Sequence, residues 1–432
     1  MRPHALPIEG AAPGYVVSSP RVWPQTGAAT VRILFLTPRF PYPPLKGDTL
    51  RAYHQIRALH AAGHSITLLS LADAPVNYDH LAEMQRMCTQ VEVVPLPKAR
   101  ALLNMGLGVF STRPLQVSHY VSSRFRRLLA ARLAEEQYDA VHVALIRMLP
   151  YVWHANPAHP PVVVDLIDSL ALNLEARRKS ARGLLKLAYE LEYRRVRRYE
   201  KETIRRFPAL AVSSPTDKEA LGGDHVAVIP NGVDLARFPF EPMHGRDPET
   251  LVFTGNMGYG PNEEAVIWFA GEVWPMLRQA HPNLRFLVVG TNPGERIEAI
   301  GRETPGISVL GQVPDVSAYL GKATLAVAPM RSGSGIQNKV LEAMSAGAPI
   351  VTTSIGNRGV GAQHPQHLLV ADTPHDFARA IETLLDSPQE RTKLAQAGRA
   401  YVEQHFRWEE HAHKLSQLYE VRSAECEMRN VS

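Results

Sequence analysis

Cysteine and long apolar runs are scarce in this chain of 432 residues. Its two cysteines, Cys88 and Cys426, lie far apart and follow no metal-ligand spacing, so neither a disulfide framework nor a zinc site is indicated. No uncharged apolar run reaches the roughly 18 residues that are needed to span a bilayer. We therefore expect a cytoplasmic protein that is soluble or lies peripherally on the inner face of the plasma membrane.

The N-terminal residues 1–30 also lack the unbroken apolar core of a signal peptide and are rich in Pro and Gly, which predicts a mobile tail. The net charge of +5 permits an anionic partner, such as nucleic acid, a membrane surface or a phosphorylated substrate. No recognition motif or aromatic platform accompanies the basic residues, so no nucleic-acid partner is predicted.

Short apolar, strand-like runs alternate with helical patterns in two successive series, which is typical of βαβ units and parallel sheets. The pattern predicts an α/β protein with two doubly wound, Rossmann-like domains. Pro and Gly cluster between the two series, and the last segment reads as helices with no strand after them. We expect the final helix to return to the first domain, on which its apolar residues Trp408, Leu415 and Leu418 would pack. The predicted parts are a tail (1–30), a first domain (31–214), a second domain (215–404) and a crossing helix with its tail (405–432).

The segment from Gly333 to Pro349 carries the most chemical information. A strand leads into a loop of small residues, then into a helix that starts near Gln337 and stops at Gly347. Glycines let backbone amides approach a ligand, and the helix start adds partial positive charge, so the arrangement suits a diphosphate. Lys339 adds a full charge, and Glu342 can accept hydrogen bonds from ribose hydroxyls. From spacing alone, an ordinary strand-loop-helix crossover fits equally well.

This segment resembles the donor-site signature of family 4 glycosyltransferases, and in particular the sugar transferases of bacterial exopolysaccharide systems, whose helix reads much like "QNKVLEAMSAG". Three more motifs fall in the order expected for that family, and the resemblance spans residues 31–420. It implies the GT-B fold, in which two Rossmann-like domains face a cleft, and a sugar transferase that uses a nucleotide-diphosphate donor. The three motifs are "IPNGVDLARF" (229–238), "FTGNMGYGPN" (253–262) and "VPDVSAYLGKATLAVAPM" (313–330).

The resemblance assigns donor-binding roles position by position. Glu342 matches the second glutamate of the family's E-x7-E motif, which holds the ribose, whereas Ser334 stands in place of the first. Gly255 and Asn256 occupy a loop that usually supplies an Arg/Lys pair to the diphosphate. Because both cations are missing there, Lys339 and the amides after Gly335 are expected to substitute for them. The donor-binding set implied is Gly47, Gly255, Asn256, Ser334, Gly335, Asn338, Lys339 and Glu342.

The resemblance defines the catalytic residue less clearly than the donor-binding residues. In relatives a histidine just after a strand lies near the acceptor, within a pattern like "DVVHVH". This chain has "DAVHVA", which puts Ala144 in place of the second histidine and leaves His142, within the strand, as a candidate beside Lys339. A buried structural histidine is the competing interpretation of His142, and Arg147 and Asp168 are alternatives at strand ends. The family implies retention of anomeric configuration by front-face attack, no metal or other cofactor, and a glycan or polyprenyl-linked acceptor. Its role would be in cell-surface or exopolysaccharide synthesis.

The segment from Arg182 to Arg206 holds nine basic and four acidic residues. Helical periodicity puts most of its cations on one face and its aromatic and aliphatic residues on the other. A core-packed helix with a solvated face is one interpretation. The other is contact with an anionic membrane surface or a lipid diphosphate, to which the short apolar segment 100–110 would contribute. The residues predicted for this contact are Arg194, Arg197, Arg198 and Lys201.

Two other functions stay open at this point. A degenerate GT-B protein that binds nucleotide sugar or lipid without turnover would account for Ser334 and for Ala144 in the histidine pattern. A sugar-nucleotide epimerase of the same fold is less favoured, because no set of acid and base residues for it can be placed.

Overall fold

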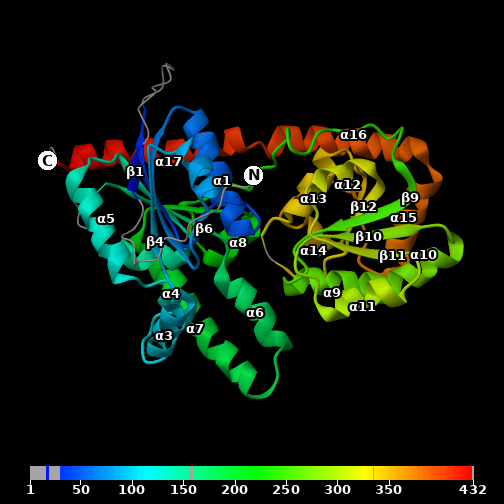
Figure 1. Ribbon diagram of the computed structural model, residues 1–432, viewed down its shortest axis with the longest axis horizontal. Coiled ribbons are helices and arrows are strands. Elements are labelled where there is room, and N and C mark those ends of the chain that lie inside the picture. The colour runs from blue at the N-terminus through cyan, green and yellow to red at the C-terminus, as the bar shows by residue number, and fades with distance from the viewer. Residues whose placement is uncertain (1–15, 19–29, 155–159, 334, 431–432) are drawn as a thin grey trace, which may run out of the picture. The chain divides into compact units, whose positions relative to one another are not determined.

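The computed structural model describes residues 16–18, 30–154, 160–333 and 335–430 (Figure 1). The chain divides into two compact units. One comprises Met1–Asp165 with Ser416–Ser432, and the other comprises Leu166–Leu415. Strand β6 contains the point of division. The parts predicted from the sequence are 1–30, 31–214, 215–404 and 405–432. Their boundaries were drawn from the two predicted sheets and not from contacts between residues, so they stay a prediction.

The first sheet has the strand order β1-β4-β3-β2-β5-β6-β7-β8. Its strands pair in parallel from β4 to β6, whereas β1 is antiparallel to β4 at the edge. The strands are β1 (Val16–Ser18), β2 (Arg32–Thr37), β3 (Ser65–Ala72), β4 (Gln90–Pro95), β5 (Ala140–Ala144), β6 (Val162–Ile167), β7 (Ala209–Val212) and β8 (Val226–Val228).

From β2 onward, helical segments lie between successive strands, as connections between parallel strands require. Their bounds are α1 (Gly47–Ala61), α2 (Tyr78–Gln85), α3 (Lys98–Gly108), α4 (Leu115–His119), α5 (Ser123–Glu135), η1 (Ile146–Tyr151), α6 (Leu170–Ser180), α7 (Gly183–Arg206) and α8 (Pro215–Leu221).

The second sheet is parallel throughout and has the order β11-β10-β9-β12-β13-β14. This is the doubly wound order, in which strands are added first on one side of the first strand and then, from the fourth strand on, on its other side. The strands are β9 (Asp247–Thr254), β10 (Arg285–Val289), β11 (Ile307–Gly311), β12 (Ala323–Ala328), β13 (Ile350–Thr352) and β14 (Leu369–Val370).

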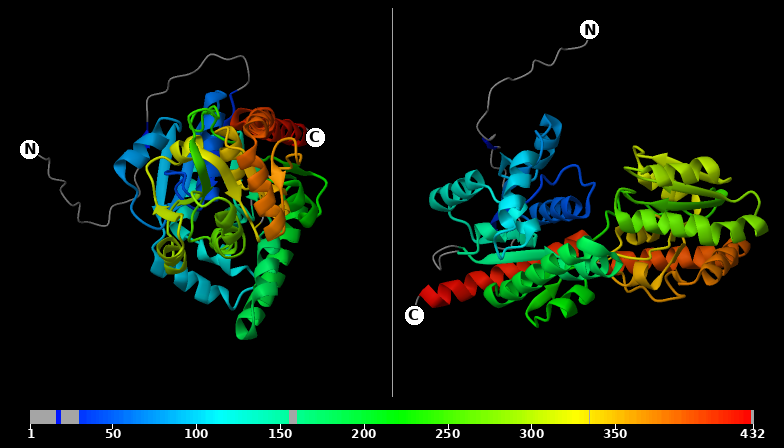
Figure 2. Two further views of the ribbon diagram at one scale, coloured as in Figure 1. Left: turned by 90° about the vertical axis from the view of Figure 1, so that its right-hand side faces the viewer. Right: turned by 90° about the horizontal axis from the view of Figure 1, so that it is seen from below.

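Helices cover both faces of the second sheet, as Figures 1 and 2 show. Alternate residues of β9 point to opposite faces, so Leu251 and Phe253 pack with one helix layer and Val252 with the other. The helices are α9 (Gly260–Trp268), η2 (Phe269–Val273), α10 (Trp274–Ala280), α11 (Glu295–Glu303), α12 (Val316–Lys322), α13 (Asn338–Ser345), α14 (Ser354–Asn357), α15 (Pro374–Asp386) and α16 (Pro388–His405).

The last helix, α17 (Trp408–Asn430), returns to the first unit as the sequence predicted. Ser416 Oγ lies 2.8 Å from His64 Nε2, and Tyr419 Oη lies 2.8 Å from His142 Nδ1. Trp408 was expected to take part in this return, but it packs on Gly232 within the second unit instead. The two predicted Rossmann-like domains and the returning helix are therefore confirmed.

Candidate functional site: the switch point of the second sheet

The loops that follow β9 and β12 meet where the strand order of the second sheet reverses. In open α/β sheets this switch point, at the carboxyl ends of the strands, is where ligands bind. Gly255 follows β9 directly, and the loop after β12 leads through Gly335 to α13. The structure therefore brings the two motifs, which are far apart in the sequence, to one edge of the sheet.

Gly255 lies in a turn with no room for a side chain. A Cβ atom on Gly255 would lie 2.8 Å from Asn262 Nδ2, and one on Gly290 would lie 1.6 Å from the Gly255 carbonyl oxygen. Asn262 Nδ2 in turn donates a hydrogen bond of 2.9 Å to the carbonyl oxygen of Asn256. The loop is therefore packed from both sides, and a cationic side chain at position 255 would not fit.

Lys339, the second residue of α13, approaches this turn from the other side. Its Cε atom lies 3.5 Å from the position that a Cβ atom of Gly255 would occupy. Its Nζ donates to Gln337 Oε1 at 3.0 Å and lies 5.6 Å from the centroid of the Phe253 ring. Burial lowers the pKa of Lys339 to about 8, although the charge of Glu342 opposes this shift.

Glu342 lies one turn further along α13 and is partly buried. Burial raises its pKa, and the nearby charges of Arg237 and Lys339 oppose that shift. Among the described residues, its carboxylate has no hydrogen-bond or ion-pair partner. A carboxylate that is partly desolvated and has free lone pairs is well suited to accept hydroxyl hydrogen bonds from a ligand.

Asn338 and Gly335 complete the part of the predicted donor set that lies in this unit. Asn231 Nδ2 donates to Asn338 Oδ1 at 3.1 Å, which joins the motif at residues 229–238 to the start of α13. Gly335 has φ +66°, and a Cβ atom on Gly359 would lie 2.3 Å from its carbonyl oxygen. Ser334 lies outside the described residues.

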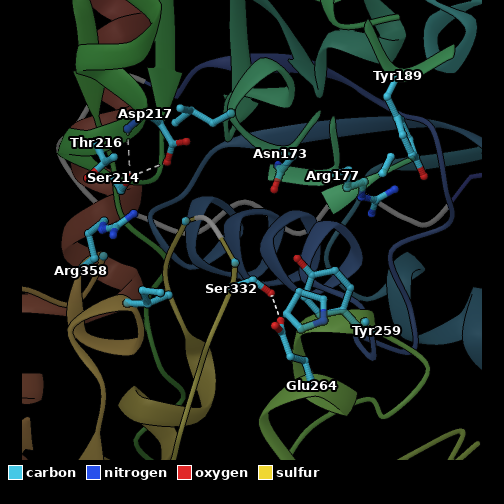
Figure 3. A pocket seen from close by; sticks show the side chains of 18 of the residues that line it. Asn173, Arg177, Tyr189, Ser214, Thr216, Asp217, Tyr259, Glu264, Ser332 and Arg358 are labelled. Carbon is cyan, nitrogen blue, oxygen red and sulfur yellow. Dashed lines mark hydrogen bonds between the residues drawn. The ribbon is translucent and has the colours of Figure 1, made fainter. Parts of the chain in front are cut away.

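A cavity of about 580 Å³ opens beside this loop within the second unit (Figure 3). Gly335 is the member of the predicted donor set that lines it, and α6 and α7 form another part of its wall. Ser332 Oγ donates to Glu264 Oε2 at 2.5 Å, and Ser214 is hydrogen-bonded to Asp217. The other lining residues that Figure 3 labels are Asn173, Arg177, Tyr189, Thr216, Tyr259 and Arg358.

Sequence reasoning missed Arg177 and Arg358, two exposed lining residues with no ion-pair partner among the described residues. Arg358 follows the short helix after β13, so the rule that ligands bind beyond strand ends could have found it. Arg177 lies on α6, which no motif singled out. Both guanidinium groups are available to an anionic or hydroxyl-rich substrate.

Gly47 and His142 belong to the first unit. Gly47 is the first residue of α1, and a Cβ atom there would meet nothing within 4 Å. His142 lies in β5 with 0% exposure, stacked on Phe35 at 4.0 Å between ring centroids. Burial lowers its pKa to about 4. This placement favours the structural interpretation of His142, because no substrate atom can reach the ring through the closed core.

The cations predicted for membrane contact lie along α7. Arg194 Nε is 2.7 Å from Glu190 Oε1, and Arg198 Nε is 3.0 Å from Glu202 Oε1. Arg197 and Lys201 are exposed and have no ion-pair partner among the described residues. Two of the four charges are therefore partly neutralised within the helix.

Comparison with known proteins agrees with this geometry. Residues 47–232 match the model of the glycosyl transferase 4-like domain, and residues 248–387 match that of the glycosyl transferases group 1. The chain belongs to the group 1, or family 4, glycosyltransferases. This transferase is 25% identical over 416 residues to a glycogen synthase of Mycobacterium tuberculosis, covering 90% of this chain and 94% of that one.

Further relatives support the same family and fold. A phosphatidyl-myo-inositol mannosyltransferase of Mycolicibacterium smegmatis is 27% identical over 376 residues, covering 84% of this chain and 87% of the relative. The solved sucrose-phosphate synthase of Thermosynechococcus elongatus superposes with a TM-score of 0.66 at 17% identity, covering 91% of this chain and all of that one. WaaG, a glycosyltransferase involved in lipopolysaccharide biosynthesis, gives 0.62 at 15% identity, covering 90% and 99%. The transferase therefore has the GT-B fold.

Within residues 16–18, 30–154, 160–333 and 335–430, no group of three or more His, Cys, Asp or Glu side chains is placed to hold a metal ion. In the same residues no helix is both long and apolar enough to pass through a bilayer. That the transferase needs no metal stays a prediction.

Proposed function

We propose that this glycosyltransferase moves a hexose-type sugar from a nucleotide-diphosphate donor to a glycan or polyprenyl-linked acceptor, with retention of configuration. The observation that carries the proposal is the pair formed by Glu342 and Lys339 on α13. One is a partly buried carboxylate that has no hydrogen-bond or ion-pair partner within the described part of the chain, and the other is an ammonium group that approaches the loop after β9. The pair supplies an acceptor for ribose hydroxyls and a cation for the diphosphate.

The proposed reaction breaks the bond between the anomeric carbon and the diphosphate oxygen while the acceptor oxygen attacks from the same face. The acceptor's hydroxyl proton passes to the departing phosphate oxygen, so the protein need not supply a strong base. Negative charge grows on the diphosphate as the bond breaks, and Lys339 with the amides after Gly335 stabilises it. Interactions that strengthen in this way lower the barrier.

Names of similar proteins support the donor and the pathway. HepE of Anabaena has been solved in complex with UDP and with UDP-glucose, at 17% and 16% identity to this chain. A 22% identical protein of Klebsiella pneumoniae is described as lying in the cps region. We propose that the activity serves cell-surface or exopolysaccharide synthesis, and these names support that role.

Calorimetric titration with nucleoside diphosphates and their sugar conjugates tests the donor site. We expect saturable binding by one nucleotide series, loss of that binding in Glu342→Ala, and no change in Glu303→Ala, which removes an exposed acid on α11. NMR of the product from an accepted donor then reads its anomeric configuration. Binding without transfer to any glycan or lipid-linked acceptor, and without donor hydrolysis, would instead support the degenerate binding protein.

A further inference from the structure

The first turns of α7 present leucines to solvent on a helix that buries none of its residues there. Leu184 is 86% exposed, Leu187 is 66% exposed and Leu191 is 53% exposed. The first buried residue of α7 is Glu192. Residues 183–191, which we call the α7 tip, therefore form an apolar surface that the described part of the chain leaves uncovered. Large apolar side chains gathered in this way mark an interaction site.

The α7 tip is a built element and not a frayed end. Arg178 of α6 donates to Glu190 Oε2 at 2.7 Å and lies over the Tyr193 ring at 4.5 Å, so α6 holds α7 just beyond the leucines. The tip also adjoins the cavity described above, because Leu185 and Tyr189 line its wall. The exposed leucines and the cavity wall therefore belong to the same two helical turns.

The charge around the α7 tip indicates which kind of partner binds it. Residues 175–190 hold five basic side chains against two acidic ones, Glu175 and Glu190. Arg182 and Lys186 are exposed and have no ion-pair partner among the described residues. A second copy of the chain would bring the same positive surface against this one, which is unfavourable. Anionic lipid headgroups would attract the basic residues, while the leucines enter the region of the acyl chains.

We propose that the α7 tip inserts into the surface of an anionic bilayer. The contact holds the cavity wall formed by Leu185 and Tyr189 at the lipid surface, where a lipid-linked acceptor can enter without leaving the membrane. That purpose rests on the proposed function, whereas the membrane contact itself does not. The surface differs from the basic face predicted from the sequence, because exposed leucines contribute as much to it as cations.

A different observation in the first unit supports membrane contact independently. Helix α3 packs by Ala101 and Gly108, and the segment from Lys98 to Arg113 contains no acidic residue. The cations Lys98, Arg100 and Arg113 have no ion-pair partner among the described residues. We call this surface the α3 patch. Its exposed apolar side chains are Leu102, Leu103, Leu107, Val109 and Phe110, the last of which is 92% exposed.

Flotation with vesicles tests the proposal without any nucleotide or acceptor. The vesicles contain phosphatidylcholine alone, or phosphatidylcholine with phosphatidylglycerol. We expect the wild-type chain to float with the anionic vesicles only. Leu184→Ser/Leu187→Ser/Leu191→Ser should weaken the partition at least about tenfold, since each leucine loses most of its transfer free energy. Leu103→Ser/Leu107→Ser/Phe110→Ser is the parallel variant for the α3 patch, and its partition should fall independently.

Tyr78→Ser is the matched control, because Tyr78 on α2 is 79% exposed and lies in neither surface. Its partition should equal that of the wild type, and thermal unfolding should show that every variant folds. Equal flotation of the wild type and the α7 variant would overturn the proposal for the α7 tip. Absence of wild-type flotation, or a wild-type dimer that the leucine variant dissociates, would assign the surface to a different occupant.

Failure of the membrane contact can be distinguished from failure of the proposed function. Nucleotide titration without vesicles reports the donor site, and flotation without nucleotide reports the two surfaces. None of the three substituted leucines lines the cavity. The α7 variant should therefore keep the wild-type rate of donor hydrolysis in the absence of vesicles.

Discussion

The Cε atom of Lys339 lies 3.5 Å from the point where a Cβ atom of Gly255 would stand. The resemblance expects a cation from the loop after β9, and we propose that Lys339 supplies it instead from α13, because its side chain reaches the same place. Position 255 has no space for a side chain of its own, because Asn262 fills it. The structure thus explains how a loop without cations can still present positive charge at the switch point.

Glu342→Ala should weaken donor binding by about 1.5–3 kcal/mol, the usual contribution of a hydrogen bond to a charged group. The fold should be unaffected, since the carboxylate has no hydrogen-bond or ion-pair partner among the described residues. Calorimetry gives the affinity, and circular dichroism confirms the fold. Unchanged donor affinity would remove Glu342 from the site.

Lys339→Ala should lower kcat more than it weakens donor binding, because charge on the leaving group grows in the transition state. The pH profile provides a second readout. The pKa of about 8 means that the ammonium form is lost as the pH rises through that value, so wild-type kcat should fall there. Lys339→Arg keeps its charge and should remove this fall. A profile shared by all three proteins would exclude the role.

Gly290→Ala should destabilise the second unit by about 2–4 kcal/mol, because the added methyl group meets the Gly255 carbonyl and Gly290 has φ +146°. Thermal denaturation measures the effect. Gly294→Ala, where a Cβ atom meets nothing within 4 Å, is the matched control and should leave Tm nearly unchanged. Equal Tm values for the two variants would mean that the loop after β9 can move aside.

Stability should fall as the pH decreases from about 6.5 to about 4, partly because of His142. Its folded-state pKa of about 4 is below the unfolded value, so over this range the unfolded chain takes up a proton that the folded chain does not. Below about pH 4 the loss in the free energy of unfolding due to His142 approaches about 3 kcal/mol. His142→Gln should show a flatter dependence of unfolding free energy on pH. Parallel curves for both proteins would contradict the assigned burial effect.

Substituting Arg197 and Lys201 by Gln should weaken binding to anionic vesicles about as much as substituting Arg194, Arg197, Arg198 and Lys201 together. The reason is that Arg194 and Arg198 already pair with Glu190 and Glu202. The effect should vanish at 1 M salt, where the Debye length is about 3 Å. A much larger loss in the quadruple variant would show that the paired arginines also contact lipid.

The sequence by itself determined the two doubly wound sheets and helix α13. Strand and helix periodicities are local, and the order of the motifs places "QNKVLEAMSAG" after a strand of the second series, so α13 with Lys339 and Glu342 could be predicted. The return of the last helix was also predictable, because terminal helices that no strand follows need a partner surface. Its contact residues were only partly foreseen, since Trp408 packs on Gly232.

Tertiary structure alone decided which residues share the site and which surfaces stay uncovered. Gly255 packs against Asn262 and Gly290, and the side chain of Lys339 lies beside Gly255. These contacts join segments that are far apart in the chain. Periodicity assigned Leu185 to the apolar face of α7, for which packing in the core was one interpretation. Leu185 is nevertheless 57% exposed, because a helical pattern shows that a face is apolar but not what covers it. The burial of His142 and the exposure of the α7 tip follow from such long-range packing, which no local pattern encodes.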